Sequence, residues 1–180
     1  MRQLRKFVIN VIFIAMVFVI YFLQANFFSW FTISGVMPNV FIIFVLFVGL
    51  FAGKSSGTIY GLFIGIILDF LFKTKIGLTS IVLGGIGFLA GVFDKNFSKD
   101  SRITIMFMVL GSTVLAEIAL YFLNIVFLEG QVEILSFVKI LIIEVIYNLI
   151  LTIIFYPLMQ KFGYYIENEY KGNQILTRYF

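Results

Sequence analysis

The chain has 180 residues, of which 62% are hydrophobic and 12% charged, and 24 are Phe. This composition excludes a soluble domain and predicts an integral membrane protein. The chain lacks Cys, which excludes disulfides and thiolate metal sites, and it lacks His, the commonest catalytic base and metal ligand. The net charge of +4 comes from Lys and Arg scattered at the ends of apolar runs. That scatter favours membrane orientation over binding to nucleic acid.

The first apolar run covers residues 7–23 and follows a short basic segment that contains Arg2, Arg5 and Lys6. The arrangement resembles a secretory signal, but residues 24–27 offer no small-residue cleavage site. We therefore expect an uncleaved first membrane helix. The uncharged segment that follows is rich in Phe and contains Trp30, which predicts an aromatic belt at the membrane surface.

The next two runs, residues 38–52 and 58–72, are separated by a five-residue polar break. So short a break predicts a turn, and hence a tight helical hairpin inside the bilayer. Glycine occupies every fourth position through this hairpin, at Gly49, Gly53, Gly57, Gly61 and Gly65. Because residues four apart share one helix face, these glycines predict a smooth surface for close helix packing.

Three further spans are expected at residues 78–93, 103–128 and 137–159, followed by a polar, tyrosine-rich cytoplasmic tail at 160–180. The first of these again carries glycines close to one face, at Gly84, Gly87 and Gly91. The sequence thus predicts an all-α protein, a single transmembrane domain of six helices over residues 1–180. Several spans have only about 15 to 17 residues, fewer than the ~20 that a perpendicular helix needs.

Six spans place both termini on one side of the membrane, and the basic residues indicate which side. Ten basic residues fall with the termini: Arg2, Arg5, Lys6, Lys54, Lys95, Lys99, Arg102, Lys161, Lys171 and Arg178. Three fall on the other side: Lys73, Lys75 and Lys139. The excess of basic residues predicts that both termini are cytoplasmic.

For the glycines, close packing inside one chain is the favoured interpretation, and a surface for another subunit is the alternative. Glycine in a helix interior costs up to ~1 kcal/mol relative to alanine, so five at regular spacing indicate a tight contact somewhere.

Three carboxylates lie within apolar spans, at Asp69, Glu117 and Glu144. Charged side chains are costly in a bilayer, so each is expected to face protein or water, and residue counts place all three in the outer half. Helical spacing puts Glu117 on one face with Tyr121 and Asn124, and it groups Glu144 with Tyr147 and Asn148. These residues predict either a polar outer site for a ligand or partner, or bonds among themselves that hold the helices together.

Enzyme functions are disfavoured by the residues that the chain lacks. An intramembrane serine protease needs a histidine base, and a zinc protease needs histidine ligands. A transferase that works through carboxylates alone remains open, but the three acidic residues come from three helices with no spacing that fixes their geometry. We expect no catalytic residues, metal or cofactor.

Several of these motifs together resemble the MreD family of rod-shape-determining membrane proteins. Pro38 and Asn39 begin an apolar helix. Glycine then recurs at every fourth residue before Asp69, and Gly77 and Leu78 follow. The later residues that carry the resemblance are Glu144, Tyr147, Asn148 and Pro157. Family members often have an arginine near the end of the second helix, whereas here Phe51, Ala52 and Gly53 precede Lys54.

The resemblance implies a non-enzymatic scaffold subunit of the bacterial cell-elongation complex in the cytoplasmic membrane. Its partner would be an MreC-type bitopic protein, and through that protein it would reach the actin-like MreB-type filament and the peptidoglycan synthases. The family fold is also similar to the substrate-binding subunits of energy-coupling-factor transporters. A vitamin-type transporter subunit is therefore the alternative function, an analogy at the level of fold.

Overall fold

The computed structural model describes residues 2–72, 77–94, 99–128 and 132–171. In these ranges the chain forms six α-helices, α1 (Arg2–Phe22), α2 (Val40–Ala52), α3 (Lys54–Phe72), α4 (Leu78–Phe93), α5 (Arg102–Leu128) and α6 (Ile134–Lys171). A π-helical turn, η1 (Leu23–Phe27), and a 3-10 turn, η2 (Phe28–Phe31), continue α1. The all-helical prediction is confirmed. Lys73, Lys75, Lys95 and Arg178 lie outside the described residues.

Four helical segments are long and apolar enough to cross a membrane, formed by α1 with its two turns, by α3, by α5 and by α6. The other two helices are shorter, and α2 is the shortest with 13 residues. Every residue of α2 from Phe41 to Ala52 is buried. A helix that is apolar on all sides belongs in a protein interior, so α2 is the central helix of the bundle rather than a lipid-facing one.

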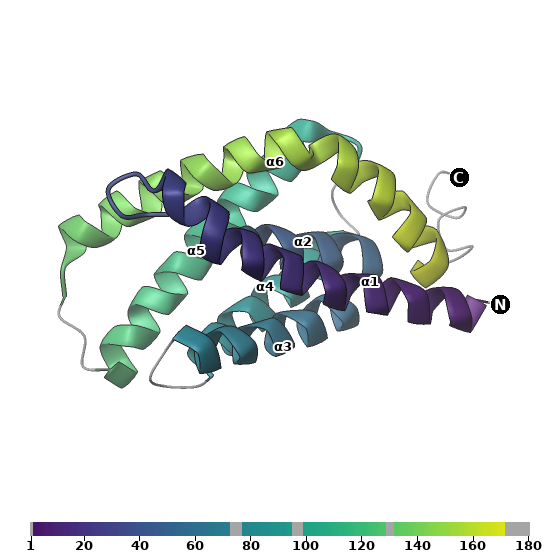
Figure 1. Cartoon of the computed structure of the whole chain (residues 1–180), viewed down its shortest axis with the longest axis horizontal. Coiled ribbons are helices and arrows are strands. Elements are labelled where there is room, and N and C mark those ends of the chain that lie inside the picture. The colour runs from purple at the N-terminus through teal and green to yellow at the C-terminus, as the bar shows by residue number, and fades with distance from the viewer. Residues whose placement is uncertain (1, 73–76, 95–98, 129–131, 172–180) are drawn as a thin grey trace.

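The other helices surround α2 (Figure 1). In the figure α3 and α4 lie below it, α1 crosses in front, and α6 forms an arc above. The long helices keep many large apolar side chains exposed, such as Phe18 on α1, Phe107 on α5 and Ile154 on α6. An exposed apolar surface of this extent is what a bilayer or a partner would cover.

The turn between α2 and α3 is tighter than the sequence predicted, because Gly53 alone forms it. Its φ of +97° lies in a region that other residues rarely adopt, and its N–H donates to the carbonyl of Gly49 at 3.1 Å. The α3 helix begins at Lys54, so the expectation that the turn runs to Gly57 is wrong. Residues 54–57 form the first turn of α3 instead.

The glycines of α3 lie against the backbone of α4. A Cβ atom added at Gly57 would lie 2.5 Å from the carbonyl oxygen of Gly87, and one at Gly61 or Gly65 would meet the backbone of Leu83 or Ser80 at less than 3 Å. Gly49 of α2 reaches the same point, since its Cβ would also lie 2.5 Å from the Gly87 oxygen. Three helices therefore meet backbone to backbone, with no room for a side chain.

Two further glycines of α4 also face α3. Gly91 lies against the backbone of Lys54, whereas Gly84 meets only the flexible end of the Leu62 side chain. By contrast, Gly85 of α4 and Gly111 of α5 have no atom within 4 Å of the added Cβ position. The glycine faces that were predicted to pack are filled by helices of the same chain, and the open positions lie elsewhere.

The last helix is longer than predicted. We expected a span that ends at residue 159 and then a polar tail, but α6 continues to Lys171 with Pro157 inside it. Gly163 lies in this extension, and a Cβ there would lie 2.5 Å from the ring of Phe51 on α2. The tail boundary was wrong because the extension packs on the core, which its polar composition did not indicate.

We predict that Gly61→Leu destabilises the chain by at least about 1 to 3 kcal/mol, because the new side chain must push α3 away from the α4 backbone. The measurement is the fraction of purified protein that stays monodisperse in mild detergent after heating. The matched control is Gly85→Leu, on an open position of α4, which should melt close to wild type. If both variants melt like wild type, the close contact of Gly61 with the α4 backbone is contradicted.

Candidate functional site

The polar residues of α5 and α6 face one another in register. The Asn148 side-chain amide donates to the Thr113 hydroxyl at 3.0 Å. One turn away, the Glu144 carboxyl lies against that of Glu117 and against the side chain of Asn39. Four-residue spacing on both helices places these pairs one above the other. The structure thus brings together Glu117, Glu144 and Asn148 from the predicted polar site.

This row of polar residues also holds the start of α2. The backbone N–H of Asn39, just before α2, donates to the side-chain oxygen of Asn148 at 2.9 Å. Asn148 is fully buried, and Thr152 donates to its carbonyl at 2.6 Å. The first N–H groups of a helix have no partner within it, so Asn148 supplies an acceptor for one of them.

Glu144 is the most enclosed carboxyl of the row, with 6% of its surface exposed, whereas Glu117 is half-buried. Its Oε1 atom is buried and has no hydrogen-bond partner in the described ranges. The same holds for the hydroxyl of Tyr121, one turn from Glu117 on α5, whose ring stacks on Phe137. Buried oxygens without a donor are rare in folded proteins.

Tyr147 points to a different neighbour. Its hydroxyl donates to the carbonyl of Phe31, so it ties the η2 turn to α6. The sequence grouped Tyr147 with Glu144 and Asn148, but its hydroxyl bonds to Phe31, in the segment after α1. The three residues therefore do not form one patch.

Asp69 has a separate role, at the turn between α3 and α4. Its carboxylate is fully buried and accepts backbone N–H groups from Gly77 at 2.8 Å, Thr79 at 3.0 Å and Ser80 at 3.3 Å. Gly77 adopts a φ of +115°, which turns the chain into α4. Negative charge is favourable at a helix N-terminus, so Asp69 caps α4.

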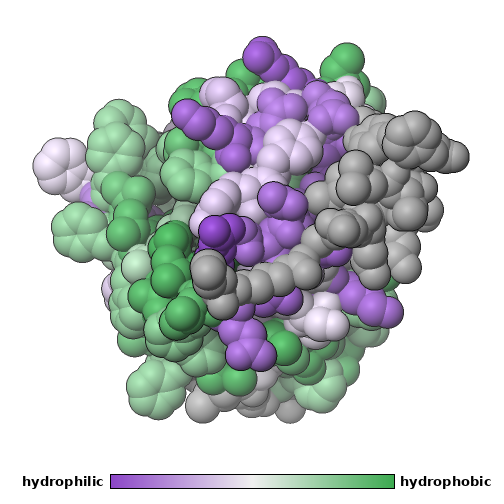
Figure 2. All heavy atoms as spheres, turned by 90° about the vertical axis from the view of Figure 1, so that its right-hand side faces the viewer, coloured by the Kyte–Doolittle hydropathy of each residue, from purple (hydrophilic) through white to green (hydrophobic). Residues whose placement is uncertain are grey.

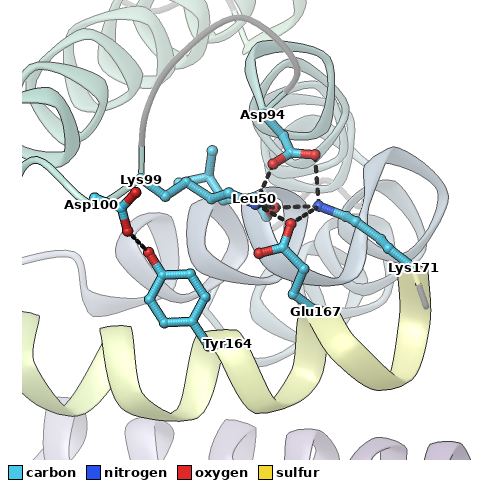
Figure 3. Close-up of polar contacts among 7 residues, drawn as sticks. All are labelled: Leu50, Asp94, Lys99, Asp100, Tyr164, Glu167 and Lys171. Carbon is cyan, nitrogen blue, oxygen red and sulfur yellow. Dashed lines mark hydrogen bonds and ion pairs between the residues drawn. The ribbon is translucent and has the colours of Figure 1, made fainter. Parts of the chain in front are cut away.

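A second polar cluster lies at the end of the bundle where α1 begins and α6 ends, which we call the terminal end. Lys99 and Lys171 each bridge Asp94 and Glu167, and both ammonium groups donate to the carbonyl of Leu50 near the end of α2 (Figure 3). Cations are favourable at helix C-termini, where carbonyls lack partners. The two lysines therefore cap α2, and the two carboxylates balance their charge.

More polar contacts surround this cluster and fix the extension of α6. Tyr164 donates to the Asp100 carboxylate, and Arg5 of α1 pairs with Glu169 at 2.8 Å. In Figure 2, which faces this end, hydrophilic residues cover its middle and hydrophobic ones lie toward the flanks. The bond from Arg5 shows that the beginning of α1 and the end of α6 lie together.

Comparison with known families matches a family model, rod shape-determining protein MreD, over residues 1–166. The chain belongs to the MreD family. Searches of curated proteins and of solved structures returned no match. The likeness to energy-coupling-factor subunits therefore stays a prediction. Family membership and the four long apolar helices make this a membrane protein, of a family that determines rod shape.

The sequence did not reveal the terminal cluster of this MreD chain, although one signal was present. Glu167 and Lys171 are four residues apart, which favours an ion pair on a continuing helix. Lys99 and Arg102 were counted among the basic residues that indicate membrane orientation, and Asp94 was not singled out. Only the fold shows that Asp94 and Lys99 close over the end of α2.

The environment of Asp94 affects its ionisation. Burial opposes the charged form, but hydrogen bonds and charge attraction from Lys171 and Lys99 outweigh it, so the pKa of the Asp94 carboxyl is held below its usual range. A depressed carboxyl pKa stabilises the fold above the unfolded-state pKa. That contribution is lost as the pH falls through the folded-state pKa.

We predict that Asp94→Asn lowers the melting temperature at neutral pH, because it leaves two buried ammonium groups short of one negative charge; breaking such a pair costs about 3 to 5 kcal/mol. As the pH falls from about 7 to about 3, the melting temperature of the variant should also decline less than that of wild type. The measurement is melting against pH in detergent. Glu133→Gln, at an exposed position just before α6, should keep the wild-type profile, and an unchanged profile for Asp94→Asn would contradict this role of the Asp94 carboxylate.

We also predict that Asp69→Ala destabilises the chain by at least about 1 to 3 kcal/mol, because buried N–H groups at the start of α4 lose their acceptor. Asp69→Asn keeps one acceptor oxygen and should lose less. Melting in detergent distinguishes them, with Asn168→Ala at an exposed position of α6 as the control. Wild-type melting of both Asp69 variants would show that the cap contributes nothing.

Proposed function

We propose that this chain is a non-enzymatic scaffold subunit of the bacterial cell-elongation complex in the cytoplasmic membrane, with both termini in the cytoplasm. The observation that carries the proposal is the family match over residues 1–166. The partner is an MreC-type bitopic membrane protein. Through it the chain connects an MreB-type actin-like filament with the peptidoglycan synthases.

The mechanism that we propose is recognition by helix packing on a preformed surface. The tight contact among α2, α3 and α4 supports a rigid interior, because backbone contacts leave little room for rearrangement. A partner helix cannot use the glycine faces of α3 and α4, since the chain fills them itself. The partner must therefore bind an outer helix.

The outer face of α5 is the surface that we propose for this contact. Gly111 leaves open space there, beside the exposed side chains of Phe107 and Leu115. Ser112, the next residue along the helix, is a half-buried polar residue within an apolar span. Small and polar residues are the usual means by which membrane helices associate, since apolar surface alone does not distinguish a helix from lipid.

We predict that Gly111→Leu reduces the recovery of the MreC-type partner about tenfold, which corresponds to 1.4 kcal/mol of binding free energy. The measurement is quantitative co-purification from native membranes in mild detergent. Gly85→Leu is the matched control, since it fills an equally open position on α4. Wild-type recovery with Gly111→Leu would exclude this face of α5, and no recovery of the partner by the wild-type chain would exclude the scaffold function.

The alternative function is that of a substrate-binding subunit of a vitamin-type transporter, whose fold the chain would share. The observation that favours it is the buried polar row of α5 and α6, where Glu144 keeps an oxygen without a partner. Such a subunit would bind its substrate without any partner, and bound substrate would raise its melting temperature. Purification with an ATPase pair and a membrane coupling subunit, in place of an MreC-type protein, would support this alternative.

A further inference from the structure

The connection between α1 and α2 carries a cluster of exposed aromatic side chains. Trp30 is 86% exposed, and Phe27 and Phe31 each expose about half of their surface. The ring centre of Phe27 lies 5.4 Å from that of Phe28 and 5.0 Å from that of Phe31. We call residues 27–36 the aromatic projection. Aromatic rings that gather at an exposed place mark a surface that something other than water covers.

The aromatic projection has a defined backbone conformation. After the 3-10 turn η2 it closes in a tight turn, because Ile33 and Val36 exchange two bonds from N–H to carbonyl, both of 3.0 Å. Between them, Ser34 and Gly35 have φ values of +52° and +79°, as in a type I′ turn. A Cβ atom added at Gly35 would find no atom within 4 Å, so the tip of the turn stands clear of the bundle.

Two neighbouring residues of α6 hold this connection. The hydroxyl of Tyr147 donates to the carbonyl of Phe31, and the side-chain oxygen of Asn148 accepts the N–H of Asn39 at 2.9 Å. The connection therefore lies beside α6 (Figure 1). Because one bond lies within the aromatic projection and the other shortly after it, the projection is linked to the bundle at two points.

The aromatic projection is uncharged, and this indicates what covers it. No charged residue occurs between Lys6 and Lys54. Two polar side chains at its beginning are turned onto the backbone, since Asn26 donates to the carbonyl of Phe22 at 2.9 Å and Ser29 donates to that of Asn26 at 2.8 Å. Protein interfaces rely on polar rims and complementary charges for specificity, whereas lipid requires neither. The surface therefore fits lipid.

The position of the projection along the chain fits a membrane surface. The α1 helix begins at the terminal end with Arg5 and Lys6, whose charges belong outside the hydrocarbon core. Trp30 follows Lys6 by 24 residues, a helical length of about 36 Å, whereas the hydrocarbon core is about 30 Å thick. Trp30 thus reaches the opposite headgroup layer. Trp is enriched there because its ring is apolar and its N–H is polar.

We propose that the aromatic projection inserts into the lipid headgroup layer of the leaflet opposite the termini, with Trp30 as its anchor. It inserts as one unit with α6, because Tyr147 and Asn148 hold the connection against that helix. Since the projection carries no charge, its insertion does not require anionic lipid. The sequence predicted only an aromatic belt, without this link to α6. The insertion is a property of the chain alone and does not depend on the scaffold function.

The test uses the fluorescence of Trp30, the single Trp of the chain. The full chain is reconstituted in phosphatidylcholine nanodiscs, both faces of which are open to the solvent. The lipids carry bromine, which quenches Trp fluorescence, either high on the acyl chain or near its end. We expect bromine high on the chain to quench at least about twofold more strongly, since interfacial segments lie roughly 5 to 10 Å into the boundary of headgroups and acyl chains.

Two further quenching measurements complete this test. Iodide in the water should quench Trp30 at most about half as strongly as it quenches a free tryptophan amide, because headgroups cover the ring. Replacing part of the lipid with anionic phosphatidylglycerol should leave the ratio of shallow to deep bromine quenching unchanged. Full quenching by iodide would place the ring in water, and stronger quenching by deep bromine would place it in the hydrocarbon core. Shielding from both quenchers would place it against protein, such as a second copy, and each of these three results overturns the proposal.

Variants calibrate the depth and test the link to α6. The double variant Phe18→Trp with Trp30→Phe moves the single Trp by 12 residues, about 18 Å, to an exposed position in the middle of α1. Its fluorescence should be quenched most by deep bromine. Tyr147→Phe should lower the fluorescence anisotropy of Trp30, because the projection then moves independently of α6. Tyr121→Phe is the matched control, since that hydroxyl has no hydrogen-bond partner in the described ranges, and equal anisotropy of both variants would overturn the link.

Discussion

The structure depends on the backbone contact among α2, α3 and α4. Gly49, Gly57 and Gly87 meet at one point, where a single added methyl group would collide with a carbonyl. Membrane helices gain little from burying apolar surface against each other, because lipid is equally apolar, so close packing must supply the attraction. The contact lets two short helices, α2 and α4, lie inside a bundle whose longer members face outward. Once α2 is enclosed in this way, both of its ends need partners other than water.

The long helix α6 provides partners for both ends of α2. Near one end Asn148 accepts the N–H of Asn39, and at the other Lys171 donates to the carbonyl of Leu50. A buried helix terminus without such partners would be costly, since its first N–H and last C=O groups have no bonds within the helix. This requirement explains why α6 continues past its apolar part. The polar extension completes the core and is not an appendage to it.

The sequence predicted part of the site and missed part, for identifiable reasons. Carboxylates in apolar runs are costly, which marked Asp69, Glu117 and Glu144 as residues that must face protein or water. That argument does not say what each one faces. Asp69 caps α4, the next helix along the chain, whereas Glu117 and Glu144 face each other across two helices. The terminal cluster was missed because Lys99 and Glu167 are far apart in the chain, and no local pattern connects them.

By itself, the sequence determined the membrane class, the helical content and the faces on which helices can approach closely. These follow from local properties, namely apolar run length and the four-residue period of glycine. The sequence predicted a hairpin of α2 and α3. Only the tertiary structure decided that the glycine face of α3 packs mainly on α4. It also decided that the polar end of α6 belongs to the core, and that Glu117 of α5 faces Glu144 of α6. Each of those results depends on which helices become neighbours, and that choice is made by shape complementarity between segments distant in sequence.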